Sequence, residues 1–389
     1  MKIDAIRAYL LRLPFKTPQT LAGRTEEFLD TVYVGLSSGG VTGWSEVAPG
    51  NSPLVTGEWS QGVFMSLTQN IFPILAENSG VQTAEKLEEL FAPIRGNRQA
   101  IAAIDMAWWD LKTRLDKVPL WKGIGGQQRP IELGLCFDRC EEIRREEFFA
   151  QLQRCAAERF RRVTLKYRPG WEVEPVRVAR QICSPVTELV ADFEGVFTME
   201  TVSERLYRLQ DFFPITVEQP IDPSDLVGSS MLQEGLRMPL ALDEAVCSPL
   251  AALLALDLAA GRKLCIKPGR VGGLTAARQI AHSAFEHEVP CYAAMDLLTP
   301  LGYRAVLAAA SLEGFSLAAD YARFDEIFDA PISGAVPYRA GGNSADSNSA
   351  DNTDGEFARA ELWEEPGIGI DPAPELLEEC FLDSFEVEL

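Results

Sequence analysis

The chain has 389 residues, of which 36 are basic and 57 acidic, so its net charge at neutral pH is −21. This excess of negative charge argues against binding to nucleic acid or to an anionic membrane surface, because both need a basic face. Hydrophobic residues make up 47% of the chain, which is enough for a large core and excludes wholesale disorder.

The sequence points to a cytoplasmic protein without a membrane span. Its first residues, Met1 to Arg7, carry charges where a signal peptide needs an apolar stretch, and no apolar run reaches about 18 residues. The eight cysteines form no CxxC pair and are expected to be small buried hydrophobic residues in a reducing compartment. Because the chain has only two histidines, a zinc site at Cys136 and Cys140 is not expected.

The first part of the chain, residues 1–126, has the pattern of an α+β domain. Alternating apolar residues predict strands, and spacing of three to four residues predicts helices after them. The expected strands are 2–12, 29–36 and 41–47, and the expected helices are 59–77, 83–92 and 98–116.

From residue 127 to about 325, short apolar runs alternate with amphipathic segments. The eight candidate strands are 131–137, 161–166, 187–192, 215–218, 239–243, 263–267, 290–294 and 315–320. Strands that alternate with helices indicate parallel βα units. Because no Gly-x-Gly-x-x-Gly follows the first of them, a closed (β/α) barrel is favoured over an open dinucleotide-binding sheet.

Residues 341–357 are polar and of low complexity, and we expect them to be a disordered insert. The segment 366–371 and a short helix after it are expected to be ordered.

Charged residues end five consecutive candidate strands, where apolar residues would be expected. They are Lys166, Asp192, Glu218, Asp243 and Lys267, separated by 24 to 26 residues. This interval is one βα unit, so the repeat predicts that the five side chains meet at the C-terminal mouth of one barrel.

Three carboxylates that converge in a partly desolvated mouth would repel one another, and a hard divalent cation removes this conflict. A set of oxygen ligands favours Mg²⁺, with Mn²⁺ as an alternative. Such a cation makes a proton next to a substrate carboxylate removable. The lysines are the candidate bases, because we expect burial and nearby cations to lower a lysine pKa.

These residues resemble the enolase superfamily, muconate-lactonizing-enzyme subgroup. The resemblance is carried by Lys166-x-Arg168, Asp192, Glu218, Asp243-Glu244 and the stretch Lys267-Pro-Gly-Arg-Val-Gly-Gly273. The region 165–176 is most similar to the o-succinylbenzoate synthase and N-succinylamino acid racemase branch. The resemblance implies an α/β fold, a (β/α)7β TIM-like barrel with an α+β N-terminal capping domain that residues from about 360 to 389 complete.

The resemblance also implies a metal held by Asp192, Glu218 and Asp243, a small carboxylate substrate and a homo-oligomer. Capping-domain loops at about 15–24 and 48–57 would close over the substrate. Their candidate apolar contacts are Phe15, Leu21 and Leu54.

Three residues, Arg168, Glu194 and Asp296, differ from the family pattern, and Glu244 agrees with it. Arg168 replaces the usual second lysine, and an arginine is a poor base that could instead hold a carboxylate. Glu194 adds negative charge near the metal, and Asp296 replaces a glutamate as the expected salt-bridge partner of Lys267. Glu244 is expected to anchor Lys267 or Lys166 from behind.

Three functions remain open at this point. The first is a lyase of the o-succinylbenzoate synthase type, which eliminates water and serves menaquinone synthesis; a single base suffices for it. The second is an isomerase: an N-acylamino acid racemase, a dipeptide epimerase or a muconate-type cycloisomerase. Asp320 supplies only one of the two acids that an epimerase would use for a substrate ammonium. The third is a metal-binding barrel whose catalysis lapsed with Arg168.

Overall fold

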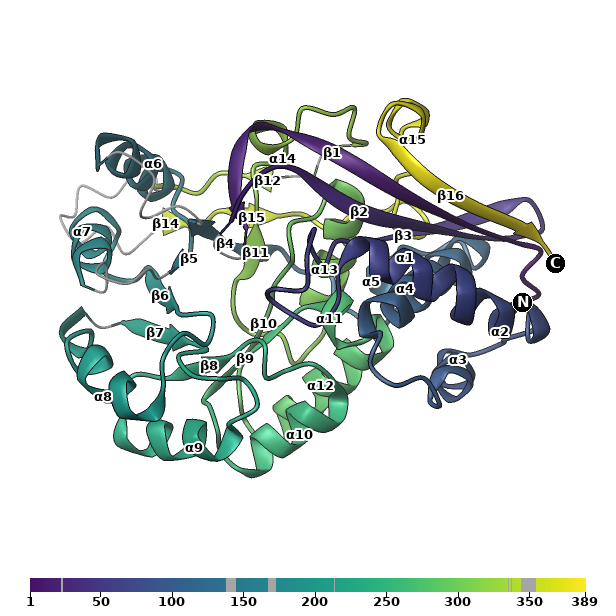
Figure 1. Ribbon diagram of the computed structural model, residues 1–389. Coiled ribbons are helices and arrows are strands. Elements are labelled where there is room, and N and C mark those ends of the chain that lie inside the picture. The colour runs from purple at the N-terminus through teal and green to yellow at the C-terminus, as the bar shows by residue number, and fades with distance from the viewer. Residues whose placement is uncertain are drawn as a thin grey trace.

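The computed structural model describes residues 1–21, 24–137, 145–166, 173–212, 214–334, 336, 338–343 and 355–389. The chain forms an N-terminal part built on an antiparallel sheet and a larger part in which parallel strands are surrounded by helices (Figure 1). The predicted fold class, a TIM-like barrel with an α+β N-terminal domain, is confirmed.

The N-terminal sheet has the strand order β16-β1-β2-β3. Its strands are β1 (Ala5–Leu21), β2 (Arg24–Ser38), β3 (Val41–Val47) and β16 (Phe381–Glu388). The prediction of a loop at 15–24 is wrong for the described residues, because β1 and β2 continue as one long hairpin in which Gln19 pairs with Glu26. Strand β16 was not predicted; it pairs antiparallel with β1, from Ala5 opposite Glu388 to Leu11 opposite Phe381.

Helices follow the sheet as expected. They are α1 (Ser60–Ser66), the π-helical turn η1 (Leu67–Ile71), α2 (Phe72–Glu77), α3 (Ala84–Phe91), α4 (Arg98–Leu115) and α5 (Leu120–Gly123). The predicted helix 59–77 contains this π turn, and Pro73 follows it in the first turn of α2, where a missing N–H is tolerated. Helix α4 packs so closely on β3 that a Cβ on Gly43 would lie 2.1 Å from the Leu111 nitrogen, so this position requires glycine.

Among the described residues, the barrel part contains eight parallel strands. They are β4 (Ile131–Phe137), β5 (Arg162–Lys166), β6 (Glu188–Asp192), β7 (Ile215–Glu218), β8 (Leu240–Leu242), β9 (Lys263–Ile266), β10 (Cys291–Ala293) and β11 (Ala319–Tyr321). Each overlaps the strand predicted from the sequence. The seven main connecting helices are α6 (Arg145–Ala157), α7 (Glu174–Ile182), α8 (Met199–Tyr207), α9 (Leu226–Gly235), α10 (Pro249–Asp257), α12 (Leu274–Glu286) and α13 (Pro300–Ala310).

The parallel strands follow the order β10-β9-β8-β7-β6-β5-β4, and β11 pairs with the other side of β4. Within the described residues, no ladder joins β10 to β11, and a single bridge between Cys291 and Phe315 connects these two edges. In the same part of the chain, no helix is long and apolar enough to cross a membrane.

Short elements complete the chain. They are η2 (Gln210–Phe212), α11 (Pro268–Val271), α14 (Phe324–Ile327), β12 (Tyr338–Arg339), β13 (Gly342–Asn343), β14 (Gly355–Glu356), β15 (Arg359–Ala360) and α15 (Pro374–Glu379). Strands β13 and β14, which lie within the expected insert 341–357, pair antiparallel. The rest of that insert, 344–354, lies outside the described residues.

Two buried carboxylates of the N-terminal part bind the first turns of barrel helices. Glu46 on β3 accepts hydrogen bonds from the backbone nitrogens of Thr299 (3.0 Å) and Gly302 (2.9 Å), at the start of α13. Asp105 on α4 accepts from the Thr275 nitrogen (3.1 Å), at the start of α12. Since the first N–H groups of a helix have no partner within the helix, these carboxylates join the two parts at the positive ends of two helices.

We predict that Glu46→Gln lowers the free energy of unfolding by about 2–4 kcal/mol, because an amide cannot accept the same set of backbone and Thr299 hydroxyl hydrogen bonds in a buried site. Urea denaturation followed by circular dichroism measures the change. Glu89→Gln, at an exposed ion pair with Lys86, is the matched control and is expected to change stability by less than about 0.5 kcal/mol. Equal effects of the two substitutions would contradict this role of Glu46.

Candidate active site

A cavity of about 480 Å³ lies between the N-terminal part and the C-terminal ends of the barrel strands. The N-terminal part contributes the segment 48–52 with Val55 and Thr56, and the hairpin of β1 and β2 contributes Thr17, Gln19, Glu26 and Leu29. The barrel contributes charged side chains at the strand ends. The cavity is therefore enclosed by apolar and polar groups of the cap above charged groups of the barrel.

Strand register brings the predicted charged residues together. Lys166 at the end of β5 pairs with Asp192 of β6, and Asp192 pairs with Glu218 of β7. Asp243 follows β8, and Lys267 follows β9. Asp192, Glu218 and Asp243 are at most 5% exposed, so their charge is not solvated by bulk water.

Lys166 is held by two carboxylates of the β6 end. Its Nζ forms an ion pair with Glu194 and lies 3.6 Å from Asp192 Oδ2. Glu194 adopts a left-handed backbone conformation (φ 48°) before Gly195, and this bend turns its side chain back toward the strand end. The predicted extra charge of Glu194 therefore lies at the lysine as well as beside Asp192.

Asp243 is held by two cations. Lys267 Nζ lies 2.8 Å from Asp243 Oδ2, and Arg270 Nη1 lies 2.6 Å from Oδ1. Arg270 reaches the carboxylate because Pro268 to Val271 form one helical turn directly after Lys267. Gly272 (φ 110°) ends this turn, and Gly273 (φ 112°) precedes α12 so close to Asp105 that a Cβ would lie 2.3 Å from the carboxylate oxygen.

The expected ion pair between Asp296 and Lys267 is present, but Asp296 has two closer partners. It accepts a hydrogen bond from Gln99 Nε2 (3.0 Å) and lies 3.5 Å from Arg270, whereas Lys267 is 4.0 Å away. Gln99 belongs to the first turn of α4, whose nitrogens at Arg98 and Gln99 donate to the Glu58 carboxylate. The cap thus reaches the barrel mouth through the N-terminus of α4.

Glu244 does not anchor either lysine by a hydrogen bond, contrary to expectation. Its Oε2 is buried and, among the described residues, has no hydrogen-bond partner. The physical reason is that Asp243 already takes both Lys267 and Arg270. Burial, together with the charge of Asp243, raises the pKa of Glu244 to about 7.

The buried carboxylates have unequal charge compensation. Burial raises the pKa of Asp192 to about 6, with Lys166 opposing this shift and Glu194 and Asp243 adding to it. The pKa of Glu218 lies well above its ordinary value because of burial and because Asp192 and Asp243 repel its charge. For Asp243, burial also raises the pKa, but Arg270 and Lys267 outweigh it and the net shift is downward.

This donor set fits a hard divalent cation. Three buried carboxylates lie at neighbouring strand ends. Among the described residues, Asp192 shares Lys166 with Glu194, Glu218 has no ion-pair partner, and Glu244 Oε2 has no hydrogen-bond partner. A cation held by Asp192, Glu218 and Asp243 would remove the repulsion that adds to the upward pKa shifts of Asp192 and Glu218.

The expected lowering of the lysine pKa is wrong for Lys267. Burial and Arg270 do lower it, but Asp243 and Asp296 outweigh them, and the net shift of the Lys267 pKa is upward. With Asp243 2.8 Å away, Lys267 is therefore a protonated cation in this state.

The three residues that were predicted as apolar contacts of the substrate have different places in the structure. Phe15 is buried against Phe328, with ring centroids 5.7 Å apart, and it does not line the cavity. Leu54 is 48% exposed and points elsewhere, whereas its neighbour Val55 lines the cavity. Arg168 and the side chain of Leu21 lie outside the described residues.

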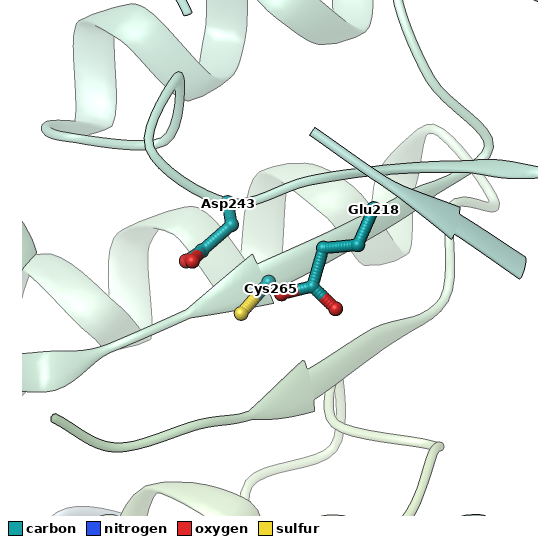
Figure 2. A group of neighbouring side chains, drawn as sticks. All are labelled: Glu218, Asp243 and Cys265. Carbon is teal, nitrogen blue, oxygen red and sulfur yellow. The ribbon is translucent and has the colours of Figure 1, made fainter. Parts of the chain in front are cut away.

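The sequence reasoning missed three other residues that contact the charged group. The hydroxyl of Tyr292, on β10, donates to Glu218 Oε2 (2.7 Å). Arg270 holds Asp243, and Cys265, assigned to the apolar core, lies with Glu218 and Asp243 in one group whose ligand atoms are within 4.8 Å of one another (Figure 2). Side chains alternate between the two faces of a strand, so Cys265 and Lys267, two residues apart on β9, share a face. This alternation was the sequence signal that could have placed Cys265 near the charged residues.

Comparisons with known proteins agree over almost the whole chain. Residues 5–125 match a family model described as mandelate racemase / muconate lactonizing enzyme, N-terminal domain, and residues 147–376 match one described as enolase C-terminal domain-like. An o-succinylbenzoate synthase of Geobacillus kaustophilus is 32% identical over 325 residues, which are 83% of this chain and 85% of that protein.

Two further comparisons cover the full length. An N-succinylamino acid racemase from an Amycolatopsis species is 27% identical over 379 residues, 97% of each protein. The solved structure of an enolase superfamily member from Listeria innocua matches with a TM-score of 0.86 and 22% identity, over 100% of this chain and 99% of that one. This last similarity shows the shared fold.

We predict that the metal-free protein loses stability as the pH rises through about 6. The folded-state pKa of Asp192, about 6, lies above its ordinary value of 3.8, so protonation favours the folded state below pH 6 and this contribution is lost above it. Asp192→Asn cannot ionise and should gain about 1 kcal/mol relative to the wild type between pH 5 and pH 7. Urea denaturation in chelator at both pH values tests this, and parallel pH profiles would contradict it.

Proposed function

The chain belongs to the mandelate racemase / muconate lactonizing enzyme family of the enolase superfamily, and on this premise we propose that it catalyses Mg²⁺-dependent elimination of water of the o-succinylbenzoate synthase type. It is a lyase or isomerase of that superfamily. The observation that carries the proposal is the row of buried carboxylates, Asp192, Glu218 and Asp243, with Lys166 at one end and Lys267 at the other.

The metal would be held by Asp192, Glu218 and Asp243. When bound there, a divalent cation supplies positive charge to the substrate carboxylate and to the negative charge that develops on it. The oxygen-only character of this set favours Mg²⁺, with Mn²⁺ as the alternative.

Lys166 is the proposed base. It lies at the cavity beside Asp192 and Glu194, which hold its Nζ at the strand end. In this structure Lys166 is ion-paired with Glu194, so it must first lose its own proton to solvent. As the free amine it then takes the proton from the carbon next to the carboxylate and returns it to the departing hydroxyl, so that water leaves and the ring becomes aromatic. Lys267 stays protonated beside Asp243 and stabilises the negative charge on the opposite side.

Arg168 has a binding role in this proposal. A guanidinium keeps its proton, so it can pair with the substrate carboxylate but cannot remove a proton. One base is enough for the elimination, because the same group can receive and return the proton. The arginine therefore disfavours a two-base reaction more than it disfavours a lyase.

The far side of the cavity suits a second carboxylate, such as the end of a succinyl chain. Arg154 from α6 and Arg323 after β11 both line it. Arg154 lies 2.8 Å from Glu326, and Arg323 lies 2.8 Å from Glu158, so both guanidinium groups are already oriented by acids. In each of these charge-assisted pairs, a substrate carboxylate could replace the protein carboxylate as the partner of the guanidinium group.

The second candidate is an N-acylamino acid racemase. It is favoured by the full-length similarity to an N-succinylamino acid racemase and by two lysines at one cavity, which suit proton transfer on two faces of a carbon. A dipeptide epimerase is less favoured, because Asp320 supplies only one of the two acids that such an enzyme would use for a substrate ammonium, and its partner Arg162 is a buried guanidinium.

We predict that the wild type converts the cyclohexadiene precursor of o-succinylbenzoate in the presence of Mg²⁺ and is inactive in chelator. Asp192→Asn should lower the rate at least about a hundredfold, because it removes one metal ligand and one charge. Ultraviolet absorption of the aromatic product measures turnover. Asp257→Asn, at an exposed carboxylate beside His287 at the end of α10, is the control with the same chemical change.

The same assay with Arg168→Lys separates the lapsed enzyme from the active one. Turnover by the wild type supports the lyase with Lys166 as base. Turnover by the lysine variant alone would overturn the lyase proposal for the wild type and support a barrel that has lost this chemistry.

A deuterium experiment tests the racemase candidate. If two lysines act on two faces, N-succinylamino acids incubated with the enzyme and Mg²⁺ in D₂O should acquire deuterium at the α-carbon, and Lys267→Ala should abolish exchange from one enantiomer only. Proton NMR and mass spectrometry detect the exchange. No exchange from either enantiomer would exclude this candidate for the compounds tested.

A further inference from the structure

A second cavity, of about 270 Å³, lies between the N-terminal part and the helices of the barrel. Its walls come from α3, from the segment 92–98 that leads into α4, and from the starts of α10 and α12. Among the described residues, none lines both this cavity and the candidate active site. The proposed reaction therefore makes no use of it.

Part of the cavity wall is apolar. Leu87 and Phe91 on α3 are each 2% exposed, and Ile94, Ile101 and Ala276 continue the apolar surface. Protein interiors are closely packed, with few empty spaces larger than a water molecule. An apolar space of this size between two packed parts is large enough for a small ligand, and its wall favours a ligand with an apolar body.

Two arginines line the same cavity. Arg95 is exposed and Arg98 is partly buried, and within the described part of the chain neither guanidinium group forms an ion pair with an acid. A Cβ on Gly272 would lie 3.7 Å from Arg98 Cδ and 3.8 Å from its Nη1, so the Arg98 side chain reaches from the N-terminal part to the junction of α11 and α12. In a chain with a net charge of −21, this cavity is a place of local positive charge.

The acids at the cavity have partners in the barrel. Glu88 accepts a hydrogen bond from Gln279 Nε2 on α12 (2.8 Å). Asp105 accepts two hydrogen bonds from Thr275, one from the backbone nitrogen and one from the hydroxyl group. Both carboxylates thus join the N-terminal part to α12, and the guanidinium groups remain available to an anion from solution.

We propose that this cavity binds a small organic carboxylate, whose apolar body packs on Leu87 and Phe91 and whose carboxylate group pairs with Arg98 and Arg95. A planar guanidinium group can bind a carboxylate through two parallel hydrogen bonds. The volume limits the apolar body to roughly one or two aromatic rings. Because the site lies outside the candidate active site, this inference does not depend on the proposed function.

Isothermal titration calorimetry with 2-naphthoate tests the site. The matched ligand is 2-naphthamide, which has nearly the same shape without the charge. The wild type should bind 2-naphthoate, and it should bind 2-naphthamide at least about tenfold more weakly because the ion pair is lost. Equal affinities for the two compounds would overturn the assignment of a carboxylate ligand, and no binding of 2-naphthoate would overturn the site.

Two variants locate the bound ligand. Arg98→Gln removes the charge but keeps the backbone nitrogen that donates to Glu58, and it should weaken 2-naphthoate binding at least about tenfold. Ala276→Leu fills the cavity from α12 and should weaken this binding as well. Arg208→Gln, at an exposed arginine after α8, is the control with the same charge change and should leave binding unchanged. Circular dichroism checks that the variants are folded.

Other occupants of the cavity or other binding places would give different results. Binding that keeps its wild-type strength in Arg98→Gln or in Ala276→Leu takes place elsewhere, for example in the active-site cavity, and would overturn the inference. A dimer in analytical ultracentrifugation that Arg98→Gln dissociates would mean that a second copy of the chain covers the arginines, and this result would also overturn it.

Discussion

The contact between the two parts of the molecule depends on buried carboxylates placed at the starts of barrel helices. Glu46 binds the first turn of α13 and Asp105 that of α12, and both carboxylates come from the N-terminal part. The segment after Glu46, residues 48–52, lines the cavity, so the position of β3 on α13 also positions this wall. A cap without these contacts would leave the strand ends open to water, and electrostatic interactions there would be weaker.

Charge is distributed unevenly within the cavity that this contact creates. Asp243 has two cations within 2.8 Å, whereas Glu218 has a tyrosine hydroxyl and Asp192 has a lysine shared with Glu194. The cations therefore gather at the two ends of the carboxylate row and leave its centre negative. This asymmetry accounts for the opposite pKa shifts of neighbouring carboxylates, and it makes the centre of the row the place where a cation gains most.

Much of the fold could be predicted because the barrel repeats a local pattern. Each apolar strand of three to seven residues is followed by a helix, and parallel strands place their C-terminal ends at one edge. The charged residues at these ends could therefore be predicted to lie next to one another. The sequence pattern does not predict which of these side chains form ion pairs or hydrogen bonds with one another. Whether Asp296 binds Lys267 or Gln99 depends on α4, which is almost 200 residues away in the sequence.

Long-range pairing explains the other differences. Strand β16 pairs with β1 from the other end of the chain, and local pattern carries little information about such pairs. The extension of β1 is a different case: it pairs locally with β2, but the register shifts between Pro14 and Gln19. Cys265 was assigned to the apolar core because its sequence neighbours are apolar, whereas its spatial neighbours across β7 and β8 are acids.

The pairing of β16 with β1 also bears on how the protein is made. Leu11 pairs with Phe381, which the ribosome adds 370 residues later. Throughout synthesis of the barrel, the outer edge of β1 has no strand partner and is open to pairing with other chains. The barrel strands β4 to β10, each paired with a neighbour made shortly before or after it, can assemble during that time, and β11 then pairs with the much earlier β4. The N-terminal sheet is therefore completed after the part that it covers.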